Sequence, residues 1–189
     1  MTNINTHAGG EHTPQAQSKL GDLDFCMPAA IIKAYTLPHP PLAIPEVGRG
    51  QERGIRDTLA AFEEVAAEIA EIAPDTIIYI TPHGVSYSDY FHISPGKSAS
   101  GDFSRFGAAK AKLETFYDTR FAKELAARAG KKGFPAGTRG ERDSSLDHGV
   151  TVPMWFINNR YREYKTVRVS QSGLSPSEHY RFGQLIAEA

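Results

Sequence analysis

Cysteine is nearly absent from this chain of 189 residues, with Cys26 as the single example. One cysteine can form no disulfide within the chain and cannot build a cysteine-rich zinc site. Because structural disulfides are typical of secreted proteins, this usage fits a reducing compartment, and we predict a cytoplasmic location.

An excess of positive charge and a long apolar run are missing as well. The chain carries 21 Lys and Arg against 22 Asp and Glu, so its formal net charge is -1. Such a chain has no general basic field to attract the phosphates of nucleic acid or an anionic lipid surface. No run reaches the about 18 apolar residues that a membrane span needs, and the charged-then-apolar order of a signal peptide is absent. We therefore expect neither a nucleic-acid partner nor a membrane.

Large apolar residues are scarce at the beginning of the chain. Residues 1–26 are rich in Thr, Asn, Gln, Gly and His, with almost no large apolar side chain before Leu20. Such a segment buries too little surface to offset the entropy lost on ordering. We predict a disordered leader over residues 1–26 and one folded domain over residues 27–189, which is long enough to build a core.

The domain begins with the pattern of a strand, a helix and a second strand. The continuous apolar run of Met27–Tyr35 predicts a strand buried on both faces, and Thr76–Ile80 predicts the next one. Between them, apolar residues spaced by three and four predict an amphipathic helix over Gln51–Ile72, which Pro74 ends. A unit of this kind favours a right-handed parallel crossover between the two strands.

The later part of the chain continues the alternation of strands and helices. Between His83 and about Ala108 the sequence predicts a long irregular stretch of the kind that often covers an active site. Strand patterns cover Tyr90–Ile93, Lys110–Tyr117 and Thr166–Ser170. Helix patterns cover Thr119–Ala129, with Gly130 as cap, and a final helix opened by the capping box of Ser175 and Glu178. The run Val150–Ile157 is apolar all round and favours a buried helix, with a strand as the alternative. The fold class predicted is α/β, with a mostly parallel central sheet and flanking helices.

Two histidines each follow the carboxyl end of an expected strand. His39 lies in Pro-His-Pro-Pro, and His83 lies in Thr-Pro-His-Gly. Ligand sites of open α/β sheets form outside the carboxyl ends of the strands, and neutral imidazole is the commonest metal ligand. Our hypothesis is that His39 and His83 hold one metal ion; the alternative is that each is a loop histidine bonded to the backbone.

A third histidine, His148, precedes an apolar segment in the turn Leu-Asp-His-Gly. Near a metal it could act as general acid or base, and the alternative is a structural histidine beside a capping Asp147. Two histidines and a carboxylate form a metal site with open positions, and the candidate carboxylates are Glu46 and Asp147. We interpret His92 and His179 as structural or surface residues.

These residues stand in three longer motifs that resemble one known family. The motifs are Pro38–Gly48 (Pro-His-Pro-Pro-Leu followed by Ile-Pro-Glu-Val-Gly), Asp75–His83 (Asp-Thr-Ile-Ile-Tyr-Ile-Thr-Pro-His) and Leu146–Met154 (Leu-Asp-His-Gly-Val-Thr-Val-Pro-Met). In this order they resemble the B-subunit-like domain of class III extradiol ring-cleavage dioxygenases, in the branch of the AmmeMemoRadiSam system and Memo-like proteins. The resemblance runs from about residue 30 to the end of the chain.

The resemblance implies an α/β fold and a non-haem Fe(II) held by two histidines and a glutamate. His39 and His83 match the two histidine ligands, and His148 matches the active-site histidine that contacts substrate. The activity implied is oxidative cleavage of a catechol-type aromatic by O₂. In the family the glutamate ligand and a base histidine follow the helix that begins here at Ser175, so the resemblance implies a domain that is incomplete at its C-terminus.

Two other functions remain open from the sequence. One is a Memo-like module that uses the same cleft to bind a peptide or small ligand without catalysis. The other is a zinc-dependent hydrolase, because imidazole ligands suit Zn²⁺ as well as Fe(II). Unpaired sheet edges would favour a homo-oligomer or a partner subunit.

Overall fold

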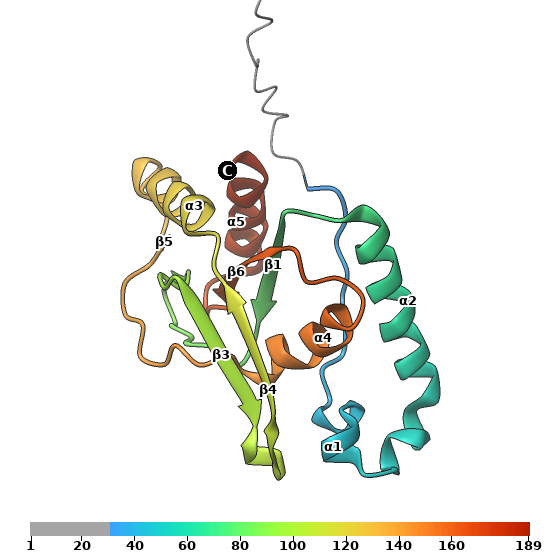
Figure 1. The fold of residues 1–189 in the computed structure, drawn as a ribbon. Helices are drawn as coiled ribbons and strands as arrows, with labels where there is room; N and C mark the ends of the chain where they lie inside the picture. Colours follow the sequence, from blue (N-terminus) through green and yellow to red (C-terminus); the bar gives the residue numbers. More distant parts are fainter. Residues whose placement is uncertain (1–30) are drawn as a thin grey trace, which may run out of the picture.

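A pair of parallel strands lies at the centre of residues 31–189, the part of the chain that the computed structural model describes (Figure 1). None of the helices in this range is long and apolar enough to cross a membrane. In chain order the elements are η1 Pro41–Ala43, α1 Pro45–Gly48, η2 Gln51–Ile55, α2 Arg56–Ile72, β1 Thr76–Thr81, β2 Phe91–His92, β3 Ser98–Phe103, η3 Ser104–Phe106, β4 Ala108–Phe116, α3 Thr119–Lys131, β5 Ala136–Gly137, α4 His148–Asn158, β6 Lys165–Ser170 and α5 Pro176–Glu188.

The central pair consists of β1 and β6, which run parallel and in full register over six residues each. Two isolated bridges extend it: Ile93 pairs with Val169 in antiparallel fashion, and Tyr117 pairs with Thr166 in parallel fashion. The short strands β2 and β5 are parallel, whereas β3 and β4 form an antiparallel hairpin. The predicted α/β class with parallel strands and flanking helices is confirmed, and β3 is an additional strand in the stretch that was expected to be irregular.

Helices cover both faces of the central pair. On one face, Val167 of β6 lies in one apolar cluster with Leu125 of α3 and Phe182 of α5. On the other face, Tyr79 of β1 clusters with Met154 of α4, and α2 packs against the outer side of α4. This layering is visible in Figure 1, where α3 and α5 stand apart from α4 and α2 with the strands between them.

The helix ends show how local sequence sets the boundaries. The side chain of Ser175 accepts a hydrogen bond from the backbone N–H of Glu178, and Glu178 reaches back to Ser175, so the predicted capping box is confirmed. The end of α3 differs from prediction: the helix runs past Gly130 to a cap at Lys132, and the left-handed residue is Gly133, with φ of 59°. Either Gly130 or Gly133 could end the helix. Ala129 is buried in the core, and the helix continues through Gly130.

The first predicted strand is not present among the described residues. Residues 31–40 form no strand, and Ile31 and Ile32 are 57% and 67% exposed, so the prediction of a buried strand over Met27–Tyr35 is wrong from residue 31 onward. Residues 27–30 and the predicted leader lie outside the described residues. The crossover expected between this strand and the next is therefore absent from the described chain, where β1 pairs with β6 instead.

Side chains, and not a ladder of backbone hydrogen bonds, hold the segment that was expected to be a strand. Lys33 forms an ion pair with Glu68 on α2, and Tyr35 packs against the apolar cluster between α2 and α4. Apolar runs predict burial but not the partner, and a strand exists only where a neighbouring backbone pairs with it. The segment instead runs extended along the molecule toward His39.

Candidate metal centre

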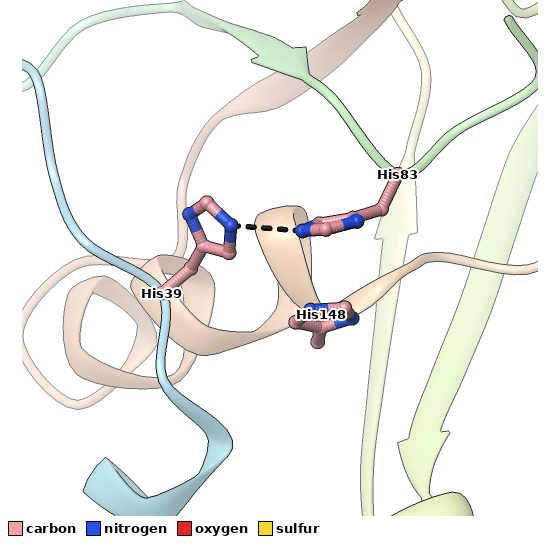
Figure 2. Close-up of side chains that lie close together, drawn as sticks. All are labelled: His39, His83 and His148. Atoms are coloured by element: carbon pink, nitrogen blue, oxygen red, sulfur yellow. Dashed lines mark hydrogen bonds between the residues drawn. The ribbon is translucent and has the colours of Figure 1, made fainter.

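Three histidines converge at the carboxyl end of β1. One ring nitrogen from each of His39, His83 and His148 can be chosen so that all three atoms lie within 4.8 Å of one another. Figure 2 shows that they come from three separate parts of the chain: the segment before η1, the loop after β1 and the first residue of α4. The structure thus brings together all three residues that the sequence had selected.

Prolines hold the segment around His39. Pro38 precedes it and Pro40 follows, and Pro41 opens η1 at a position where a missing N–H costs nothing. The fully buried Ile44 fixes the far side of the segment in the core. The backbone carrying His39 is therefore stiff, and its imidazole is presented with little loss of freedom.

Thr81, the last residue of β1, connects the positions of the other two histidines. Its hydroxyl accepts a hydrogen bond from the backbone N–H of His83, with N and O 3.1 Å apart. The same hydroxyl donates to Oδ1 of Asp147 at 2.6 Å. Oδ1 also accepts from the N–H of Gly149 at 2.8 Å, which makes Asp147 the N-cap of α4. Thr81 is buried, so the loop carrying His83 and the helix carrying His148 are locked to one hydroxyl group.

The imidazoles contact one another, and within residues 31–189 they make no hydrogen bond to the backbone. Nε2 of His39 and Nε2 of His83 are 2.9 Å apart, a contact in which one ring donates and the other accepts. The ring of His148 stacks on that of His83 with centroids 4.0 Å apart, and His39 lies 5.6 Å from it. The alternative of loop histidines bonded to the backbone does not describe His39 and His83.

The electrostatics of the cluster favour the neutral form of His148. Burial lowers the pKa of His148 below its usual value, the neighbouring His83 and His39 lower it further, and Asp147 opposes them. A protonated His148 would lose hydration of its charge and would lie beside the rings of His83 and His39. The protonated form is therefore disfavoured, and the pKa falls. Neutral imidazole is the form that binds a metal or accepts a proton.

The donor set suits a metal ion. Neutral imidazole is a common ligand of both iron and zinc, and three such rings face one another here. Neither proposed carboxylate belongs to the group: Glu46 lies outside it, and Asp147 uses Oδ1 to cap α4, with Oδ2 buried and unpaired.

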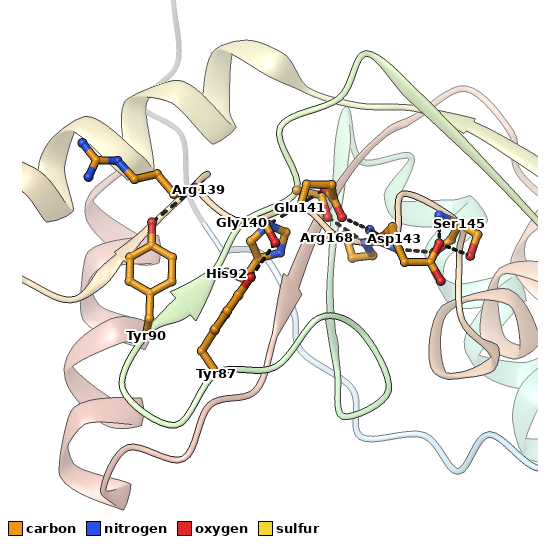
Figure 3. Close-up of polar contacts among 10 residues, drawn as sticks. Tyr87, Tyr90, His92, Arg139, Gly140, Glu141, Asp143, Ser145 and Arg168 are labelled. Atoms are coloured by element: carbon orange, nitrogen blue, oxygen red, sulfur yellow. Dashed lines mark hydrogen bonds and ion pairs between the residues drawn. The ribbon is translucent and has the colours of Figure 1, made fainter.

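A buried arginine holds the loop of residues 138–147 that leads to His148 (Figure 3). Arg168 of β6 is only 2% exposed, and its Nε donates to Oγ of Ser94 at 2.7 Å. Its terminal nitrogens donate to the backbone carbonyl of Ser145, to that of Asp143 and to Oε1 of Glu141. One side chain from the central strands therefore fixes the loop two residues before Asp147 begins the cap.

A second buried group, His92 on β2, lies beside this arginine. Its Nε2 is 4.0 Å from Oε2 of Glu141 and has no hydrogen-bond partner in the part of the chain that the structure describes. Burial, and next the charge of Arg168, lower the pKa of His92 from 6.5 to about 4. The hydroxyl of Tyr87 donates to the carbonyl of Gly140 nearby, which ties a further point of the loop (Figure 3). His92 is 1% exposed, so the sequence-based alternative of a surface residue is wrong for it.

Two residues near the cluster were missed by sequence reasoning. Thr81 is one, and the other is Phe106, whose ring stands edge-on to that of His148 with centroids 5.4 Å apart. A signal for Phe106 existed: the turn Arg105-Phe106-Gly107 directly precedes the predicted strand Lys110–Tyr117, which needed a partner strand. The alternation in Ser98–Phe103 was too weak to supply it, because Ser, Gly and Asp are poor strand formers.

The chain matches the model of a known protein family and is similar to a protein of a clostridium. Residues 33–189 match the family model described as the catalytic LigB subunit of aromatic ring-opening dioxygenase. The chain is also similar to a protein of Clostridium acetobutylicum called "Protein CA_C1420", with 39% identity over 171 residues. That similarity covers 82% of this chain but only 35% of the relative, so the chain spans about a third of its length.

Proposed function

Because the chain belongs to the LigB family, we propose that it is a non-haem Fe(II)-dependent oxidoreductase that cleaves a catechol-type aromatic ring with O₂. The observation that carries the proposal is the convergence of His39, His83 and His148 at the carboxyl end of β1.

Each histidine has a role in this proposal. His39 and His83 hold the ion through Nε2, from a proline-stiffened segment and from the end of β1. When bound, Fe(II) supplies the one-electron and O₂ chemistry that amino-acid side chains lack. His148, kept neutral by its surroundings, accepts a proton from a substrate hydroxyl as general base. Asp147 and Thr81 position it by fixing the first turn of α4.

The proposed Fe(II) site requires a third protein ligand besides His39 and His83. A two-histidine, one-carboxylate site needs an acidic side chain, and the histidine cluster of residues 31–189 includes none. Since the chain spans 35% of its relative, we propose that the carboxylate comes from outside the described residues or from a partner subunit or second copy. His83 is exposed, so the cluster is open to such a ligand.

A zinc-dependent hydrolase is the second candidate, and a specific observation favours it. Three histidines without a carboxylate are a ligand set used by catalytic zinc, which keeps its fourth position for water. In this case His148 is a ligand and not a base. The third reading, a Memo-like binding module, requires no metal at all.

Metal titration under anaerobic conditions separates these functions. We expect Fe(II) to bind near one per chain. In a second step, in air-saturated buffer, we expect catechol to stimulate oxygen uptake by the iron-loaded chain. His39→Ala should lower metal affinity by more than the about 10-fold to 100-fold that loss of a residue supporting a ligand costs, because it removes a ligand itself, and it should abolish the uptake. His179→Gln is the matched control, since His179 bonds to the carbonyl of Ser175 on α5 and lies outside the cluster.

The hydrolase and the binding module predict different results in these measurements. Retention of zinc in preference to iron, with ester or amide hydrolysis that His148→Ala abolishes, would support the hydrolase. Absence of metal binding in the wild type, with a ligand or partner still bound by His39→Ala, would support the binding module. Equal loss of oxygen uptake in His39→Ala and His179→Gln would show that the histidine cluster is not the site.

A further inference from the structure

The imidazole of His148 holds its place in the cluster through the backbone that carries it. The hydrogen bond among the three rings joins His39 to His83 (Figure 2). His148 meets His83 by stacking, with ring centroids 4.0 Å apart. A hydrogen bond is directional, whereas stacked rings can slide over one another. The position of the turn before α4 therefore decides how this imidazole lies against the other two.

Two strands hold that turn through short, local contacts. The backbone N–H of Leu146 donates to the carbonyl of Ser100 on β3 at 2.9 Å. At Gly101, the next residue of β3, a Cβ atom would lie 2.5 Å from the carbonyl oxygen of Leu146, so the two backbones touch. The side chain of Asp147 accepts a hydrogen bond from the hydroxyl of Thr81 at the end of β1, at 2.6 Å. The two residues directly before α4 are thus fixed to two different strands.

A third strand holds the same turn through one long side chain. Arg168 of β6 donates from Nη1 to the carbonyl of Ser145 (Figure 3). Its Nη2 donates to the carbonyl of Asp143 and to Oε1 of Glu141, each at 3.1 Å. Its Nε donates to Oγ of Ser94 at 2.7 Å, which fixes the guanidinium on the side away from the loop. One guanidinium therefore holds every second residue from 141 to 145.

Few other contacts reach this stretch. Residues 138–147 contain no helix or strand, and residues 142–145 are exposed. The hydroxyls of Tyr87 and Tyr90 bond to the backbone of Gly140 and Arg139, near the start of the loop. An exposed segment without backbone pairing has low local stability. Without the guanidinium, the residues directly before Leu146 would lose their tie to the central strands.

We propose that Arg168 is a positioning residue of the histidine site: by holding the carbonyl of Ser145, it sets the turn from which His148 projects, and so the alignment of this imidazole with those of His39 and His83. The proposal rests on the proposed function, because alignment matters to chemistry only if the three histidines form a reactive site. Catalytic groups have to be held within about 0.5 Å of their productive geometry.

The conservative exchange of this arginine is the informative one. Arg168→Lys keeps the positive charge, but an ammonium on a flexible stem lacks the planar fork that reaches four acceptors at once. The matched control is Leu125→Ala, which opens a cavity in the apolar cluster between α3 and α5 and lowers stability without a contact to the loop. A difference between these two variants separates positioning from stability.

NMR of the metal-free full chain with isotope-labelled histidine tests the alignment itself. The wild type and Leu125→Ala should show a nuclear Overhauser effect between the rings of His148 and His83, which stack. Arg168→Lys should weaken this effect and shift the ring signals of His148. If Arg168→Lys does not fold, Ser94→Ala takes its place, because it frees Nε of the arginine, and the same signals should move less far. Unchanged His148 signals in the folded variant overturn the proposal.

Turnover of the metal-loaded chain adds a reading that a merely structural role would not give. With Fe(II) at saturation, Arg168→Lys should lower kcat for catechol-dependent oxygen uptake about 10-fold to 100-fold and leave KM nearly unchanged, whereas Leu125→Ala should keep both values. Equal losses in the two variants overturn the proposal. If the wild type takes up no oxygen but Arg168→Lys still loses the ring contact, the proposed function fails and the positioning role of Arg168 stands.

Discussion

Lowering the pH should destabilise this protein through His92. The side chain is 1% exposed, lies 4.0 Å from Glu141 and is next to Arg168. Its pKa is lowered from 6.5 to about 4, first by burial and then by the arginine. In the unfolded chain the same imidazole binds its proton near pH 6.5, so the unfolded state takes up more protons than the folded state between these values.

The size of the effect follows from proton linkage. Stability rises with pH wherever the unfolded state binds more protons, so this contribution is complete above pH 6.5 and declines as the pH falls toward 4. With these two pKa values, the free energy of unfolding should decrease by about 2 kcal/mol between pH 7.5 and pH 5. That is a large part of the about 5 to 15 kcal/mol by which small domains are stable.

Urea denaturation followed by far-UV circular dichroism at several pH values measures the effect. Other groups titrate in the same range: burial raises the pKa of Glu141, which stabilises the folded state at lower pH and so opposes His92. The comparison is therefore between the wild type and His92→Gln, which keeps a polar side chain but cannot titrate. The variant should lose about 2 kcal/mol less than the wild type from pH 7.5 to pH 5. Identical pH slopes for the two proteins would refute the reasoning.

Three further predictions concern stability near neutral pH, each read from urea midpoints. Arg168→Met should lower the free energy of unfolding by about 3 to 5 kcal/mol, because it leaves the carboxylate of Glu141 and two backbone carbonyls without the donor that Arg168 supplies. Arg160→Met breaks an exposed ion pair and should lower it by less than about 1 kcal/mol. Similar losses for both variants would contradict this prediction. Gly101→Ala should lower the free energy of unfolding by about 1 to 3 kcal/mol, because the added Cβ would overlap Leu146. Gly183→Ala within α5, where a Cβ meets nothing within 4 Å, should raise it by about 0.5 to 1 kcal/mol. The opposite order would refute the packing argument. Ser175→Ala should cost about 1 kcal/mol by removing the cap of α5, and a neutral result would mean that the capping box contributes nothing.

Local features of the fold were predictable from the sequence. The stripe of apolar residues in α2, the strand β1, the cap of α4 by Asp147 and the capping box of Ser175 depend on residues within about one turn of one another, and all were found. The three histidines were also predictable as candidates: His83 lies in a Pro-His that follows β1, and His148 lies at the start of α4. His39 was selected by a similar Pro-His, although the apolar run before it forms no strand over residues 31–40. The residues directly next to each histidine in the sequence were enough to select it as a candidate.

Pairing across the chain was not predictable in the same way. The run before His39 has the composition of a buried strand, yet β1 pairs with β6, whose residues lie 89 positions further along. Composition reports that a segment is apolar and carries no information about which backbone will be its neighbour. The same limit explains why β3 was missed, since its Ser and Gly residues form a strand only because β4 pairs with them.

By itself, then, the sequence determined α2, β1 and the caps of α4 and α5, and it selected His83 after β1 and His148 at the start of α4 as candidates. Only the tertiary structure decided that His39, His83 and His148 meet within 4.8 Å, that Thr81 locks two of them together, and that Phe106 covers the third. The physical reason is that caps and stripes arise from contacts between near neighbours in the chain. The site is built by close packing between segments that are distant in sequence, and such packing exists only in the folded state.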